Sequence, residues 1–121
     1  MIEFRQLRFL LAAVDHGSLH RAAVALGIEQ STLSRSIAKL ERVVGVQLLT
    51  RSRTGVMTTI AGTEFIRSIR PMVALADWIL ARTRSAGHGR SGMLTIGHSS
   101  SISAGHLRTT LEAFRETFPE I

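Results

Sequence analysis

Hydrogen-bond donors are concentrated in residues 30–42, the segment of this sequence best suited to chemistry with an anionic partner. Hydroxyl and cationic side chains recur there at helical spacing: Ser31, Ser34, Arg35, Lys39 and Arg42. Apolar side chains alternate with them: Leu33, Ile37, Leu40 and Val44. A helix places the two sets on opposite faces, and its donors suit phosphates and base edges. The pattern predicts a DNA-contacting helix, with an ordinary solvent-facing helix as the alternative.

The residues before this segment fit a helix-turn-helix over about 18–37. That motif needs a small residue where two helices cross, a glycine in the turn and an apolar anchor on the second helix. Ala23, Gly27 and Leu33 supply these three features at offsets of four and six. Ser18 is a favourable N-cap, and with the amides after it is expected to contact a DNA phosphate.

The distribution of charge supports a polyanionic partner for the front of the chain. The net charge is +6, and 14 of the 15 basic residues are arginine, Lys39 being the exception. Residues 1–90 hold 13 basic and 6 acidic residues, whereas residues 91–121 hold 2 and 3. We therefore expect nucleic-acid binding in the first part and a different role in the second.

Other motifs give no support for catalysis. Residues 87–92 have the G-x-G-x-x-G spacing, but the strand and helix around them come in the reverse order from a dinucleotide site. Residues 97–101 lack the second glycine of a nucleophile elbow. There is no cysteine, and the five histidines have no metal-ligand spacing. We predict a protein that is not an enzyme and has no metal or cofactor.

Apolar periodicity predicts a mainly α fold: a winged helix-turn-helix in residues 1–59, then a long linker helix and an incomplete βα unit. Helices are expected at about 4–16, 18–26 and 30–44, each ended by a glycine. The two-stranded wing is expected to pair Val46–Leu49 with Val56–Thr58 across a polar turn.

The linker helix is predicted at 60–84, capped by Thr59. A heptad-like seam runs along it: Ile66, Ile69, Val73, Ala76 and Leu80. Such a seam predicts pairing with a second copy of the chain, and packing on its own domain is the alternative. A hinge is expected at 85–92.

Residues 93–121 are predicted to begin a domain that this stretch does not complete. A buried strand at 93–98 and an amphipathic helix at 104–118 make one βα unit, and a single strand has no sheet to join. No run approaches the roughly 20 apolar residues of a membrane span, so we expect no membrane partner and a cytoplasmic, nucleoid-associated protein.

From Arg5 to about Gly62 the sequence resembles the N-terminal domain of LysR-type transcriptional regulators. The matching stretches are 5–9, 17–19, 21–23, 30–35, 40–41, 45–49, 51–53 with Gly55, and Thr59 with 61–62. Residues 92–97 and 114–119 more weakly resemble the opening βα unit of the family's effector-binding domain. Glu29 departs from the family, which usually has serine or threonine at this cap.

The resemblance implies a sequence-specific regulator that binds double-stranded DNA. The base contacts would be Gln30, Ser31, Ser34 and Arg35. Arg53 at the tip of the wing would enter the minor groove. Arg51 would contact the DNA backbone. The positions of Ser18 at a helix start and of Lys39 and Arg42 on the outward face of the 30–44 helix predict three further backbone contacts. A non-specific, nucleoid-like DNA-binding protein is the alternative.

The seam and the resemblance together imply partners. The seam predicts a homodimer, or a higher oligomer in a full-length chain, that would bind an inverted-repeat operator. Ser99, Ser100 and Ser101 would be weak effector ligands, and a small-molecule inducer would bind only where the rest of the effector domain is present. We expect no complete inducer site within these residues.

Overall fold

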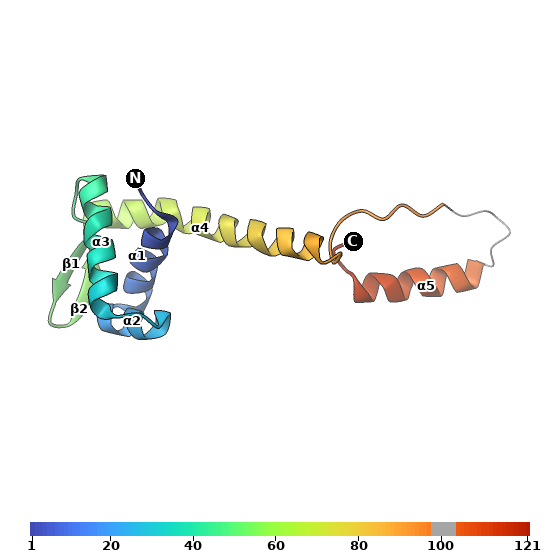
Figure 1. The fold of residues 1–121 in the computed structure, drawn as a ribbon, viewed down its shortest axis with the longest axis horizontal. Helices are drawn as coiled ribbons and strands as arrows, with labels where there is room; N and C mark the ends of the chain where they lie inside the picture. Colours follow the sequence, from blue (N-terminus) through green and yellow to red (C-terminus); the bar gives the residue numbers. More distant parts are fainter. Residues whose placement is uncertain (98–103) are drawn as a thin grey trace. The chain divides into compact units, whose positions relative to one another are not determined.

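The computed structural model describes residues 1–97 and 104–121 (Figure 1). Its elements in chain order are α1 (Phe4–His16), α2 (Leu19–Leu26), α3 (Gln30–Val44), β1 (Leu49–Ser52), β2 (Gly55–Thr58), α4 (Ile60–Gly87) and α5 (Ala104–Thr117). Two compact units are present, Met1–Leu75 and Ala76–Ile121. The predicted fold class, mainly α with a two-stranded wing, is confirmed. Within the described residues, no helix has the length and apolar character to cross a membrane.

The first three helices end at glycines, as the sequence predicts. Gly17, Gly27 and Gly45 have φ angles of 65°, 67° and 86°. This left-handed region strains any residue with a Cβ, so glycine ends each helix at little cost. At the start of α2, the Ser18 hydroxyl oxygen accepts a hydrogen bond from the Arg21 N–H at 3.3 Å, which confirms the predicted N-cap. Glu29 makes no such bond at the start of α3.

The core of the first unit lies where α1, α2 and α3 meet β1 and the first half of α4 (Figure 1). The largest fully buried apolar side chains are Leu10, Leu33, Ile37, Leu40 and Leu48. Three of them come from the inner face of α3, so the apolar half of the predicted pattern holds that helix against the core.

The second strand of the wing lies where it was predicted, with Gly55 added at its start, and the first strand is displaced along the sequence. β1 and β2 pair antiparallel from Leu49 opposite Thr58 to Ser52 opposite Gly55. The prediction of a strand at Val46–Leu49 is therefore wrong except at its last residue. A hairpin loop of two residues, Arg53 and Thr54, sets this register and draws the polar residues 50–52 into the strand. The Val56 N–H donates to the Gly17 carbonyl at 3.1 Å, which attaches the wing to the turn after α1.

Three elements are joined around the backbone of Leu48, and we call this set of contacts the Leu48 junction. One carboxylate oxygen of Glu41, on α3, accepts from the N–H groups of Leu48 and Leu49 at 2.8 and 3.0 Å. The Leu48 carbonyl accepts from the Thr59 N–H at 3.0 Å. The Thr59 hydroxyl accepts from the Gly62 N–H at 2.9 Å, which caps α4 as predicted. The junction thus links α3, the wing and α4.

The predicted dimer seam on α4 faces the chain's own core for most of its length. Ile66, Ile69 and Val73 are buried in the first unit's core, so predicting them as partner-facing is wrong. Apolar periodicity indicates that one face of a helix is buried, but it does not say by what. Here the core of the chain's own first unit buries that face of α4. Ala76 is half-buried and Leu80 is exposed. Large apolar side chains are also exposed on α4 outside the predicted seam: Ile60, Met72, Leu75, Trp78 and Ile79.

A bidentate ion pair also connects α4 to the end of α1. The Arg70 guanidinium donates to both carboxylate oxygens of Asp15, at 2.7 and 3.1 Å. These hydrogen bonds lower the pKa of Asp15 and raise that of Arg70 from their usual values. Both side chains are about half exposed, so solvent screens the pair and its contribution to stability is small.

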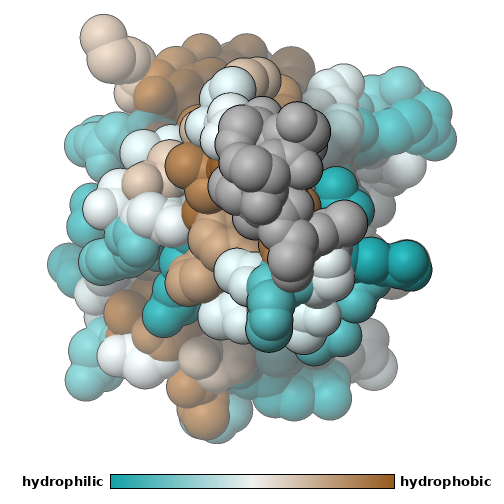
Figure 2. All heavy atoms as spheres, turned by 90° about the vertical axis from the view of Figure 1, so that its right-hand side faces the viewer, coloured by the Kyte–Doolittle hydropathy of each residue, from teal (hydrophilic) through white to brown (hydrophobic). Residues whose placement is uncertain are grey.

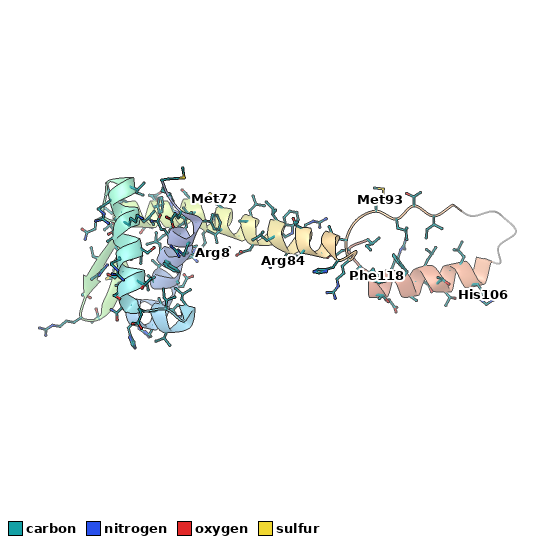
Figure 3. The ribbon with its side chains drawn as sticks, viewed as in Figure 1. Arg8, Met72, Arg84, Met93, His106 and Phe118 are labelled. Atoms are coloured by element: carbon teal, nitrogen blue, oxygen red, sulfur yellow. The ribbon has the colours of Figure 1, made fainter. Side chains whose placement is uncertain are left out.

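The second unit differs from its prediction in the hinge and in the strand. α4 continues to Gly87, so the first three residues of the predicted hinge are helical. The predicted buried strand at 93–98 is wrong over residues 93–97, which form no strand and in which Met93 is 92% exposed. A strand needs a neighbour, and the described residues of this unit offer only a single bridge, between Ser91 and Glu120. Figure 3 shows the Met93 side chain on the side of this segment that faces away from α5.

α5 ends at Thr117, one residue before its predicted end. Its half-buried apolar residues include Phe114, whose ring lies 5.0 Å from that of Phe118. Figure 2, in which this end of the chain faces the viewer, shows hydrophobic surface bordered by hydrophilic residues. The candidate effector residues Ser99, Ser100 and Ser101 lie outside the described residues.

Replacing Gly62 tests the Leu48 junction. A Cβ at this position would collide with the Leu48 carbonyl, so Gly62→Ala should lower the free energy of unfolding by about 2–3 kcal/mol. Gly87→Ala is the matched control, because it lies in the same helix and has open space around it. Urea denaturation of both variants measures the difference, and equal stabilities would show that the close approach does not matter.

Candidate nucleic-acid interface

α2 and α3 form the predicted helix-turn-helix. The Ile28 N–H donates to the Ala23 carbonyl at 3.1 Å, so the chain turns tightly after Gly27 before α3 begins at Gln30. Ala23 and Leu33 are both buried between the helices. The small residue and the apolar anchor therefore lie where the motif requires them.

The predicted donors of α3 project from the protein. The exposed members of the predicted set are Gln30, Ser31, Arg35, Lys39 and Arg42. Ser34 is half-buried, and its hydroxyl oxygen accepts a hydrogen bond from the Arg51 guanidinium at 2.8 Å. A hydroxyl that accepts in this way keeps its own hydrogen for donation. Arg51 thus connects the wing to α3 and orients Ser34.

The wing, the start of α2 and the start of α3 enclose a hollow of about 400 Å³, which we call the wing-side hollow. Four of the predicted contact residues line it: Ser18, Gln30, Arg51 and Arg53. His20 and Arg21 line it as well and were not predicted. The sequence places both residues in the first helical turn after the Ser18 cap. The side chains and the backbone amides of such a turn can bind an anion together, so both could have been predicted.

The cations on this surface are largely uncompensated. Ion pairs within residues 1–97 and 104–121 include those of Arg5, Arg67, Arg70, Arg82 and Arg108. No ion pair in that part of the chain involves Arg21, Arg35, Lys39, Arg42 or Arg53. Unpaired cations on a concave surface attract a polyanion and exchange its counterions for protein contacts.

Glu41 is a structural residue of the interface that sequence reasoning missed. It lies on α3 among the donors, but its carboxylate binds the two backbone N–H groups that begin the wing. It therefore sets the position of the wing relative to α3. No group of three or more potential metal ligands occurs in the part of the chain that the structure describes.

An exposed helix face, a two-stranded wing and a hollow between them define a winged helix-turn-helix. Residues 4–63 match the family model described as bacterial regulatory helix-turn-helix protein, lysR family. The transcriptional regulator BudR of Klebsiella aerogenes is 40% identical over 100 residues, which cover 83% of this chain and 70% of BudR. The chain belongs to the LysR family.

Longer relatives match over nearly the whole chain. The regulator TfdS of Cupriavidus pinatubonensis is 37% identical over 118 residues, which cover 98% of this chain and 40% of TfdS. This chain thus spans about two fifths of the length of that relative. The crystal structure of CbnR, a LysR family transcriptional regulator, matches with a TM-score of 0.81 and 33% identity, covering 98% of this chain and 41% of CbnR. The BenM_DBD/benA site 1 DNA complex matches with a TM-score of 0.65 and 35% identity, covering 70% and 99%.

Removing the Glu41 carboxylate should loosen the wing. Glu41→Ala leaves the N–H groups of Leu48 and Leu49 without their acceptor, which should cost about 1–3 kcal/mol of stability. Glu41→Gln keeps an acceptor oxygen and should lose less. Thermal unfolding of the two variants measures this order, and an Ala variant as stable as the Gln variant would contradict it.

Proposed function

We propose that this chain forms the DNA-binding part of a sequence-specific transcription regulator, with α3 in the major groove and the wing in the minor groove. The observation that carries the proposal is the wing-side hollow, in which residues of α2, α3 and the wing meet on one concave, cationic surface. The solved complex of BenM_DBD with DNA supports it by similarity. Chromosomal DNA as the partner implies a cytoplasmic location.

Base recognition is assigned to the first turns of α3, because this end of a recognition helix reaches the floor of the groove. Its four base-contacting residues are Gln30, Ser31, Ser34 and Arg35. Glutamine pairs with adenine and arginine with guanine through two hydrogen bonds each. Ser34, held by Arg51, donates its free hydroxyl hydrogen to a base acceptor.

Backbone contacts surround this centre. Lys39 and Arg42 lie further along α3 and are exposed. Ser18 and Arg51 line the wing-side hollow, where a phosphate would be held. Arg53 occupies the two-residue tip of the wing, from which a guanidinium enters a narrow, electronegative minor groove.

Two copies of the chain pair through the exposed apolar residues of α4, and the pair binds two half-sites related by a two-fold axis. Met72, Leu75 and Ile79 follow one another at steps of three and four, so they form a stripe along the helix. This stripe replaces Ile66, Ile69 and Val73 of the predicted seam, because the first unit's own core covers those three residues.

Selection of bound duplexes from a random DNA pool tests the proposed function. A sequence-specific dimer should enrich an interrupted inverted repeat. A non-specific, nucleoid-like protein would bind the pool without enriching any sequence, and that result would reject the proposal.

The contacts on α3 should fall into two mutational classes on the selected duplex. Arg35→Ala should weaken binding by about 1–3 kcal/mol and relax the preference for one base pair. Lys39→Ala should weaken binding to all sequences alike and reduce its salt dependence. Fluorescence anisotropy with selected and unrelated duplexes separates the classes. Equal losses on both duplexes for Arg35→Ala would make it a phosphate contact.

Substitutions on two sides of α4 distinguish association from stability. Leu75→Asp with Ile79→Asp should give folded monomers, because these side chains are exposed in the single chain. Ile69→Asp buries an unpaired charge and should lower stability by at least about 3 kcal/mol. Analytical ultracentrifugation and thermal unfolding measure the two effects. A double variant that still forms dimers would place the pairing surface elsewhere.

A further inference from the structure

A second hollow, of about 210 Å³, lies between the start of α1 and the outer side of α3. We call it the α1-side hollow. It is lined by residues that include Glu3, Arg5, Thr32, Arg35, Ser36 and Lys39. Of these, Arg35 was predicted to contact bases and Lys39 was predicted to contact the DNA backbone. The helices α1 and α3 pack against each other in the first unit, so both walls of this hollow belong to one body (Figure 1).

The two hollows border opposite flanks of α3. Gln30 lines the wing-side hollow and Ser34 contacts Arg51 of the wing, so they mark one flank. At 3.6 residues per turn, Thr32, Ser36 and Lys39 fall on the other flank of the outward face, and all three line the α1-side hollow. The reading face of α3 therefore has a concave, donor-bearing surface on each side.

The dimensions of the major groove explain how both hollows can contact DNA at the same time. An α-helix with its side chains is about 10–12 Å across, and the major groove is about 12 Å wide. A helix that fills the groove has a phosphate backbone along each flank. The wing-side hollow supplies cations to one strand, and the α1-side hollow supplies Arg5 and Lys39 to the other.

Arg5 is available for such a contact. Its side chain is 71% exposed, and its guanidinium carbon lies 6.0 Å from the centre of the Phe9 ring. One guanidinium nitrogen lies 3.5 Å from a carboxylate oxygen of Glu3. An exposed ion pair of this length contributes little free energy. A phosphate, whose oxygens offer several lone pairs to a guanidinium, can therefore replace Glu3 as the partner of Arg5.

We infer that Arg5 and Thr32 bind a phosphate of the DNA strand on the α1 side of the major groove, and that this phosphate displaces Glu3 from Arg5. This inference rests on the proposed function. It makes α1, outside the helix-turn-helix, part of the DNA interface. It also gives Glu3 an opposing role, because its charge repels the same phosphate that Arg5 attracts.

The test compares Arg5→Ala with Arg67→Ala in the full 121-residue chain. Arg67 is the matched control, because its side chain is also 71% exposed and also pairs with a carboxylate, that of Glu64 at 2.9 Å, but on α4. Affinities are measured by fluorescence anisotropy across a salt series, on a selected duplex and on an unrelated duplex of equal length. Melting temperatures of all variants establish that they are folded.

Arg5→Ala should weaken binding to both duplexes about three- to tenfold and reduce the slope of log affinity against log salt by about 0.9. Arg5→Lys should recover most of the loss, and Arg67→Ala should leave the slope unchanged. Glu3→Gln should tighten binding up to about threefold, since it removes a like charge from the phosphate site.

Equal effects of Arg5→Ala and Arg67→Ala would overturn the inference, as would a loss confined to the selected duplex. Unchanged or weaker binding by Glu3→Gln would overturn the role of Glu3. If the unmutated chain binds neither duplex, the proposed function itself fails. If it binds and Arg5→Ala binds equally well, only this inference fails.

Discussion

The arrangement of the DNA-facing surface depends on hydrogen bonds made by the backbone of one buried residue, Leu48. Its N–H is held by Glu41 of α3 and its carbonyl by Thr59 at the start of α4. Gly62 approaches the same carbonyl so closely that no side chain fits between them. Because the Leu48 side chain is fully buried as well, α3, the wing and α4 cannot shift independently.

This constraint explains how short elements present a defined surface. A hairpin of two four-residue strands has little stability by itself. Here it is fixed at its base by the Leu48 junction, at Val56 by the Gly17 carbonyl and at Arg51 by Ser34. Each flank of α3 consequently has a preformed concave surface, one with the wing and one with α1. Preformed donors lose less entropy when a phosphate binds.

The sequence predicted the structural features that depend on residues close together in the chain. The features that it did not predict depend on contacts between residues far apart in the chain. The helix ends at Gly17, Gly27 and Gly45 follow from backbone conformation alone, and the donors of α3 follow from helical spacing. Periodicity could not show whether Ile66, Ile69 and Val73 pack on their own domain or on a partner. The role of Glu41 depends on backbone groups seven and eight residues away. The residues 93–97 have strand-like composition, but pairing decides whether a strand forms.

The central claim is that α3, the wing and the start of α2 form one surface that binds DNA. Titration of the isotope-labelled chain with a selected duplex, followed by amide chemical shifts in NMR spectra, tests it most directly. The largest shift changes should fall in residues 18–21, 30–42 and 51–55, and the Leu48 amide should be among the slowest to exchange with solvent. Shift changes confined to α5, or a Leu48 amide that exchanges as fast as exposed amides, would contradict it.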